Sequence, residues 1–253
     1  MKITFLGTGT SQGIPLIACP CKVCSSIDPK DKRLRSSVMI EANGKVFVID
    51  TGPDFRQQML REHVKRLDAV IFTHAHKDHL AGFDDIRAFN YILKKKIDVY
   101  ADDIVQKAIH REFPYIFEEK KYPGIPEINL ITISDKDFTI EGVTFKPIRL
   151  FHGKLPVLGF RVGDFTYITD ANFISEEEKE KVKGSKIIVL NALRREPHIS
   201  HFTLEQSIEL MKELKPDKGY LTHISHQLGR HLQVEAELPD FIALAYDGLK
   251  LEL

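Results

Sequence analysis

The sequence predicts an α/β protein in which two mixed β-sheets pack face to face and helices cover their outer sides. Three observations support this fold class. The chain opens with hairpin-forming strands, strands and helices mix in both halves, and 253 residues suffice to bury one large core. No Pro-, Ser- or Gly-rich linker and no repeat of about 20–50 residues interrupts the pattern, so residues 1–253 are predicted to form a single domain.

The predicted strands are short runs rich in apolar, β-branched and aromatic residues, bounded by turn-forming residues. The Asn43-Gly44 pair between two of them is a strong signal for a tight hairpin turn. In chain order, strands are expected at residues 2–6, 38–42, 45–49, 69–73, 97–101, 128–133, 143–150, 157–162, 166–169, 187–190 and 219–222.

Helices are expected at residues 53–64, 83–93, 104–113, 175–182 and 203–214. The last begins with a capping box, in which Thr203 and Gln206 satisfy backbone N–H groups at the helix start. The mixed-charge cluster at 118–121 is expected to be a solvated loop or helix face.

The charge balance and the cysteine count narrow the function classes. The 36 basic and 36 acidic residues cancel, which disfavours duplex DNA or an anionic membrane as a partner bound through the overall charge. The longest uncharged run, residues 5–21, is rich in Gly, Thr, Ser and Pro and falls short of the ~20 apolar residues of a spanning helix. Three cysteines within six positions make a poor disulfide framework, and the N-terminal apolar stretch is too short for a secretory signal, so a cytoplasmic location is expected.

Histidine is the residue type that stands out, with eleven in the chain. The segment Thr73-His74-Ala75-His76-Lys77-Asp78-His79 directly follows a predicted apolar strand. In extended backbone, His74 and His76 point to the same side. If the chain turns into a helix at Asp78, then Asp78 and His79 reach the same cavity from its other side, which supplies two adjacent metal positions. The other interpretation, surface histidines in a polar turn, is weaker because such residues seldom gather at a strand end.

Three further candidate ligands each close a mostly apolar run, as His74 does. These are His152, Asp170 and His223. Loops at the ends of strands often carry catalytic groups.

In this order, the motifs resemble those of the metallo-β-lactamase superfamily of binuclear metallohydrolases: His-x-His-x-Asp-His, then a lone His, a lone Asp and a final His. The resemblance implies an αββα sandwich with a dimetal site at one edge of the two sheets. By that likeness, one zinc is held by His74, His76 and His152, a second by Asp78, His79 and His223, and Asp170 bridges the two. It also implies that Asp50 supports the metal loop from behind. Ligand type does not choose between zinc, manganese and iron.

Two metals about 3.5–4 Å apart lower the pKa of a bridging water, so that hydroxide exists at neutral pH as a nucleophile for hydrolysis. Asp78 and Asp50 are counted among the catalytic groups of this centre. A phosphodiester also benefits from protonation of its leaving alkoxide. His201 resembles a histidine motif in the ribonuclease Z branch and is the candidate general acid. His198 is the weaker alternative, and a packing histidine is the other interpretation of His201.

Cys19, Cys21 and Cys24 form a Cys-x-Cys-x-x-Cys run. Three thiolates favour a soft tetrahedral metal, but a structural zinc needs a fourth ligand. His226 lies three residues after His223 and is free to supply it, which predicts a third zinc in a Cys3His site. The alternative is three packed or reactive thiols with no metal.

The Gly-Thr-Gly-Thr-Ser-Gln-Gly start, the cysteine run and the Thr-His-Ile-Ser-His-Gln segment resemble the subgroup containing the phosphoribosyl 1,2-cyclic phosphate phosphodiesterase of carbon-phosphorus lyase pathways. The coenzyme PQQ biosynthesis protein is a relative with a comparable cysteine run. The resemblance implies that the substrate is a small, cyclic phosphodiester. The sequence is also compatible with a homodimer. The alternatives are a tRNA 3′-processing endonuclease, oxygen or sulfur chemistry at iron, and a non-catalytic binding protein of a cofactor pathway. Nucleic acid is not favoured because no basic glycine-rich arm for gripping tRNA is evident.

Overall fold

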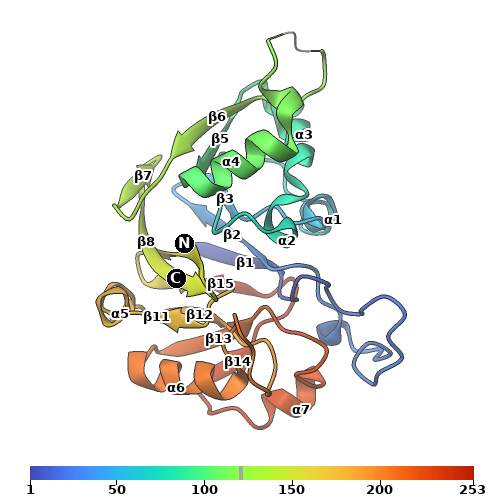
Figure 1. Cartoon of the computed structure of the whole chain (residues 1–253), viewed down its shortest axis with the longest axis vertical. Coiled ribbons are helices and arrows are strands. Elements are labelled where there is room, and N and C mark those ends of the chain that lie inside the picture. The colour runs from blue at the N-terminus through green and yellow to red at the C-terminus, as the bar shows by residue number, and fades with distance from the viewer. Residues whose placement is uncertain (120–121) are drawn as a thin grey trace.

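The computed structural model describes residues 1–119 and 122–253, and its elements form four layers in the order helices, sheet, sheet, helices (Figure 1). The predicted fold class is therefore confirmed. Lys120 and Lys121, which belong to the charged cluster at 118–121, lie outside the described residues.

The first sheet has seven strands in the order β15-β1-β2-β3-β4-β5-β6. Strands β15 to β3 pair in antiparallel fashion, and β3 to β6 are parallel. Asn43 and Gly44 both have positive φ angles, as the predicted tight turn between β2 and β3 requires. The bounds are β1 (Lys2–Gly7), β2 (Ser37–Ala42), β3 (Lys45–Ile49), β4 (Ala69–Ile71), β5 (Ile97–Ala101), β6 (Ile128–Thr132) and β15 (Lys250–Glu252).

The second sheet follows the order β11-β8-β9-β10-β12-β13-β14, and β7 also pairs with β8. Strands β8, β9 and β10 are antiparallel, and β10, β12, β13 and β14 are parallel. The bounds are β7 (Phe138–Ile140), β8 (Val143–His152), β9 (Leu155–Val162), β10 (Phe165–Tyr167), β11 (Phe173–Ile174), β12 (Ile187–Asn191), β13 (Lys218–Thr222) and β14 (Ile242–Leu244).

Helices cover the outer face of each sheet (Figure 1). The first sheet carries α1 (Phe55–Arg61), α2 (Lys77–Leu80), α3 (Arg87–Leu93) and α4 (Asp103–Glu112), and the second carries α5 (Glu176–Val182), α6 (Leu204–Leu214) and α7 (His231–Glu235). The predicted capping box is present at α6, where Thr203 and Gln206 exchange side-chain-to-backbone hydrogen bonds. No helix in the described residues is long and apolar enough to cross a bilayer.

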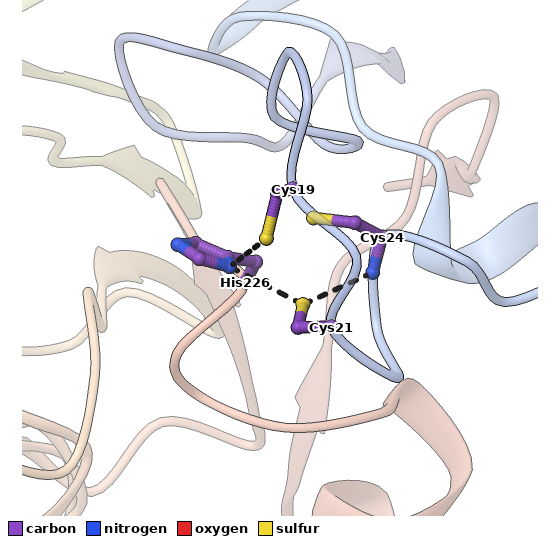
Figure 2. A group of neighbouring side chains, drawn as sticks. All are labelled: Cys19, Cys21, Cys24 and His226. Carbon is purple, nitrogen blue, oxygen red and sulfur yellow. Dashed lines mark hydrogen bonds between the residues drawn. The ribbon is translucent and has the colours of Figure 1, made fainter.

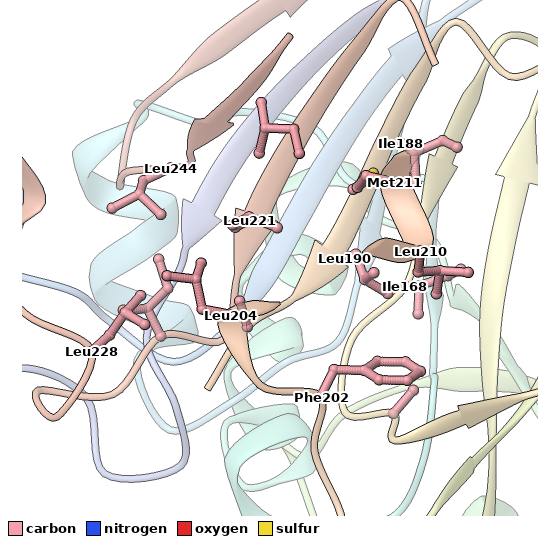
Figure 3. Close-up of a cluster of buried hydrophobic side chains, with 14 of the residues drawn as sticks. Ile168, Ile188, Leu190, Phe202, Leu204, Leu210, Met211, Leu221, Leu228 and Leu244 are labelled. Atoms are coloured by element: carbon pink, nitrogen blue, oxygen red, sulfur yellow. The ribbon is translucent and has the colours of Figure 1, made fainter. Parts of the chain in front are cut away.

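Three apolar clusters fill the spaces between the four layers. Phe5, Phe47 and Phe160 belong to the cluster between the two sheets. Phe72 and Phe83 lie between the first sheet and its helices. The third cluster joins the second sheet to α6, and Figure 3 shows its leucines and isoleucines together with Met211 and Phe202. These layers fix the strand ends, and with them the loops that carry the candidate ligands.

Several elements differ from the sequence prediction. The strands β7, β11, β14 and β15 are not predicted, because two or three residues are too few to show alternation, and the helix α7 is not predicted, because its five residues are too few to show a helical period. They form through pairing and packing with distant parts of the chain, as β15 does with β1. The predicted helix at 83–93 begins as a 3-10 helix (Phe83–Ile86) before α3, and β8 extends two residues further than predicted, to His152.

Candidate metal centre

The histidine-rich loop follows β4 and turns directly into α2. His76 precedes the helix in extended backbone, while Asp78 and His79 lie within it. His74 Nε2 lies 3.1 Å from His76 Nδ1, and His79 Nε2 lies 3.2 Å from Asp78 Oδ2. The loop therefore delivers four donor side chains to one place.

The second sheet supplies the other three candidate ligands, each at the end of a strand. His152 ends β8, Asp170 follows β10, and His223 follows β13. Asp170 Oδ1 lies 2.7 Å from His223 Nδ1, and Asp170 Oδ2 lies 3.4 Å from His79 Nε2 and 3.7 Å from His74 Nε2. Asp170 thus lies at the centre, between donors from both sheets.

The donor set fits metal ions. Asp170 is common to three groups whose donor atoms all lie within 4.8 Å of one another: Asp78, His79, Asp170 and His223; His74, His76 and Asp170; and His152, Asp170 and His201. His79 Nε2 is buried and has no hydrogen-bond partner among the described residues, as is expected of a nitrogen that ligates a metal ion. Imidazole and carboxylate donors suit zinc, manganese and iron. The third group places His201 beside His152, an arrangement that the sequence did not indicate.

Asp50 lies behind the loop, at the end of β3, and is completely buried. Its carboxylate accepts hydrogen bonds from the Thr73 N–H (2.9 Å) and hydroxyl (2.8 Å), and its Oδ2 lies 2.7 Å from His79 Nδ1. This contact leaves His79 Nε2 directed at Asp170 and Asp78. Asp50 therefore orients a donor instead of contacting the central carboxylate, the arrangement in which a carboxylate fixes a metal-binding histidine.

We expect Asp50→Asn to weaken metal binding and activity about 10–100-fold, because the amide cannot accept the His79 N–H as strongly as a carboxylate does. Metal affinity measured by competition with a chelator tests this. Asp98→Asn, in an exposed contact with Asn129 on the outer strands β5 and β6, is the control and should bind metal as the wild type does. Unchanged affinity in Asp50→Asn would show that His79 holds its orientation without this carboxylate.

Burial and charge pull the pKa values of this cluster in opposite directions. Burial lowers the pKa of His74 well below its ordinary value. Burial also acts to lower the pKa of His79, but the carboxylates of Asp170, Asp78 and Asp50 outweigh it and raise that pKa well above the ordinary value. The pKa of Asp170 is held low because His223 and His79 outweigh its burial. The centre thus concentrates negative charge in a buried space, which a cation would balance.

Three residues of the site have left-handed backbone. The φ angles are 67° for Asp50, 52° for Asp170 and 53° for His223. Side-chain-bearing residues are uncommon in this region, and they cluster at functional sites. No signal in the sequence indicates this feature.

Hydroxyl groups beside the ligands are the functional residues that the sequence analysis missed. Thr73 Oγ1 lies 3.0 Å from His74 Nδ1, Thr169 Oγ1 donates to Asp170 Oδ1 (2.6 Å), and Thr10 Oγ1 lies 3.2 Å from His223 Nε2. Two of the three immediately precede a candidate ligand in the sequence. The threonines directly before His74 and Asp170 were a usable signal.

His201 lies at the edge of the centre, in the loop between β12 and α6. Its Nε2 lies 3.5 Å from Asp170 Oδ2, and its Nδ1 lies 3.2 Å from Ser200 Oγ and 3.2 Å from His198 Nδ1. Burial lowers the pKa of His201 to about 4. His198 is more exposed and lies behind His201 Nδ1, so His201 is the histidine that faces the centre.

The cysteine run and His226 come together in a second cluster, shown in Figure 2. Cys19 Sγ and Cys21 Sγ both lie 3.4 Å from His226 Nδ1, and the Cys24 N–H donates to Cys21 Sγ (3.4 Å). This N–H and His226 lower the pKa of Cys21 to about 6, whereas burial raises that of Cys24 to about 11. The four donor atoms lie within 4.8 Å of one another, as a tetrahedral site requires.

The comparison with known families agrees with this geometry. A family model described as the beta-lactamase superfamily domain matches residues 45–224, which include the histidine loop, His152, Asp170 and His223. The chain belongs to the metallo-β-lactamase superfamily. Within the superfamily it is PhnP-like: a crystal structure described as a new diphosphatase from the PhnP family is 40% identical, covers 100% of this chain and 97% of that chain, and has a TM-score of 0.94.

Other matches include one curated relative of similar identity and two solved structures of lower identity. An octanoyltransferase of Porphyromonas gingivalis is 39% identical over 99% of this chain, but the chain spans only 51% of that protein. Zn2+-bound PqqB from Methylobacterium extorquens (TM-score 0.77, 18% identity, all of both chains) and human short-form tRNase Z (0.72, 19%, 100% of this chain and 99% of that one) share the superfamily fold.

Proposed function

We propose that the chain is a metal-dependent hydrolase that cleaves small phosphodiesters. The observation that carries this proposal is the position of Asp170, whose carboxylate lies between three sets of histidine and aspartate donors. The 40% identity to a protein described as a diphosphatase supports chemistry at phosphorus. The zero net charge is consistent with a small substrate instead of a polyanion.

In this proposal His74, His76 and the neighbouring His152 would hold one metal ion, Asp78, His79 and His223 would hold a second, and Asp170 would be a ligand available to both. Zinc is proposed, with manganese and iron as alternatives. When bound, the two ions lower the pKa of a water molecule and stabilise negative charge on the phosphoryl oxygens. Two contacts keep donors in place: Asp50 orients His79, and the Ser200 carbonyl accepts from His152 Nδ1 (2.7 Å), which leaves His152 Nε2 as a donor to metal.

His201 is proposed to give a proton to the leaving oxygen. When the Ser200 hydroxyl donates to His201 Nδ1, the ring carries its hydrogen on Nε2, the nitrogen that faces Asp170. Burial keeps the ring neutral near pH 7, but an anionic phosphodiester beside it favours the protonated form. The ring then donates from Nε2 as the bond between phosphorus and the leaving oxygen breaks.

We expect His201→Ala to lower kcat about 10²–10⁴-fold on a phosphodiester with an alkyl leaving group, and much less on bis(p-nitrophenyl) phosphate, because nitrophenolate leaves without a proton. Initial rates with zinc and with manganese measure this. The control is His110→Ala, an exposed histidine on α4 outside the site. Equal losses on both substrates would contradict the acid role, and the absence of wild-type turnover on either would overturn the proposed activity.

Cleavage of a diphosphate linkage is a second candidate, favoured by the description of the 40%-identical neighbour. Phosphorus NMR of products formed in 18O-labelled water distinguishes a broken P–O–P bond from a broken P–O–C bond. Precursor tRNA belongs in the same panel of substrates, as a test of the tRNA-processing alternative. The likeness to tRNase Z shows a shared fold and does not show a shared substrate. Tight binding without turnover across the panel would favour the non-catalytic alternative.

A further inference from the structure

The loop that carries His201 is closed at its base. The Leu193 N–H donates to the Phe202 carbonyl (3.1 Å), and the Leu204 N–H donates to the Arg194 carbonyl (2.9 Å). Between these bonds the chain passes over the edge of the metal centre, and Ile199 is 88% exposed at the tip. The closed base alone does not fix where this tip lies.

Two side chains from neighbouring elements hold the tip. His152 Nδ1 donates to the Ser200 carbonyl (2.7 Å), and Asn172 Nδ2 donates to the Ile199 carbonyl (3.1 Å). Asn172 Oδ1 also accepts from the Gly153 N–H (2.8 Å), in the turn between β8 and β9. A single amide therefore ties the tip of the loop to the turn that follows His152.

The backbone of Asn172 is held in place by hydrogen bonds to the second sheet. Its own N–H donates to the Phe151 carbonyl (2.9 Å), where β11 pairs with β8. The preceding residue, Ala171, is held by both side-chain groups of Asn191 (2.9 and 3.0 Å) and accepts from the Phe202 N–H (2.8 Å). The backbone between Asp170 and Asn172 is thus fixed relative to the second sheet, and Asn172 transmits that position to the loop.

We propose that Asn172 is a positioning residue for the His201 acid. The inference rests on the proposed function. The loop tip carries Ser200, whose hydroxyl contacts His201 Nδ1, so a shift of Ile199 and Ser200 moves the nitrogen on the opposite side of the ring. Holding that nitrogen in place matters only where the leaving oxygen needs a proton.

A water oxygen forms a bond to phosphorus and releases a proton to solvent, and the bond between phosphorus and the alcohol oxygen breaks. That oxygen keeps the electron pair and takes the proton from His201 Nε2. Solvent water then returns a proton to the ring. An alkoxide is a poor leaving group without that proton, whereas nitrophenolate leaves readily. A variant that impairs only proton delivery should therefore lose more rate on the alkyl substrate than on the nitrophenyl substrate.

The experiment compares Asn172→Ala and Asn172→Asp with the wild type. Asn172→Ala removes both amide contacts, while Asn172→Asp keeps the acceptor for the Gly153 N–H and loses the donor to the Ile199 carbonyl. We expect both to lower kcat about 10–100-fold on an alkyl phosphodiester and less than about threefold on bis(p-nitrophenyl) phosphate. KM should change little. Asn129→Ala, which removes an exposed amide contact to Asp98 on the outer strands, is the matched control.

A second readout does not depend on turnover. In metal-free protein, the imidazole resonances of His201 in 1H–15N NMR spectra should shift or broaden in both Asn172 variants and stay unchanged in Asn129→Ala. Equal losses on both substrates, no loss on either, or an unmoved His201 resonance would overturn the inference. If the wild type hydrolyses neither substrate, the proposed function fails, while the NMR spectra still show whether Asn172 positions His201.

Discussion

Asp170→Asn is expected to lose bound metal and almost all hydrolysis. Asp170 is the one residue that all three donor groups at the centre share. Its Oδ1 contacts His223 and its Oδ2 contacts His79. The amide removes a negative charge that would lie between two cations, and it offers one donor oxygen in place of two. Losing several kcal/mol of charge stabilisation in the transition state corresponds to a rate decrease of roughly a thousandfold or more.

The measurements are kcat on a phosphodiester and metal content per chain by mass spectrometry. Asp164→Asn is the matched control, because that aspartate lies just before β10 in an exposed ion pair with Lys186. It should keep wild-type metal content and rate. Full activity with the wild-type metal content in Asp170→Asn would refute the assignment of Asp170 as the shared ligand.

Cys21→Ser is expected to lose one metal ion per chain and to lower the melting temperature. Cys21 Sγ contacts His226 and accepts from the Cys24 N–H, so it lies inside the cluster. A serine hydroxyl is a poor ligand for zinc, and a metal ion held by this cluster would link the N-terminal loop to the segment after β13. A cost of about 3 kcal/mol or more would lower the Tm by roughly 6–12 °C in a chain of this length.

The same loop offers a control in Lys22→Ala, which changes an exposed side chain next to Cys21. Its metal content and Tm should match those of the wild type. The decisive comparison is in excess chelator, where the Tm values of the wild type and Cys21→Ser should converge because both have lost the ion. A difference that persists there would mean that Cys21 stabilises by packing alone, and two metals per wild-type chain in place of three would discard the Cys3His site.

The sequence predicted the positions of the candidate ligands because each one closes an apolar run. An apolar run that stops at a polar residue predicts the end of a strand, so the sequence alone places His152, Asp170 and His223 at strand ends. The meeting of these strand ends is a property of how the two sheets pack. The pairing of His226 with Cys19, 207 residues apart, was predicted because three thiolates need a fourth ligand and His226 is free beside His223, since no local pattern encodes it.

What could not be predicted depends on contacts between distant segments. Asn172 matters because its amide reaches the Ile199 carbonyl and the Gly153 N–H, and nothing in the neighbouring sequence distinguishes it from a turn residue. The short strand β11, which places Asn172, is stable only as the partner of β8. Such features follow from the assembled sheet and not from local propensity.

The left-handed backbone at Asp50, Asp170 and His223 decides which substitutions can report on chemistry. Aspartate, asparagine and histidine enter this conformation more readily than other side-chain-bearing residues. Alanine, the usual choice for removing a side chain, would add roughly 1–2 kcal/mol of backbone strain to the loss of the ligand. The measured effect of the substitution would then combine the two. Asparagine removes the donor or its charge at nearly constant backbone energy. At these three positions, asparagine is therefore the informative replacement, and an alanine scan would overstate the contribution of each ligand.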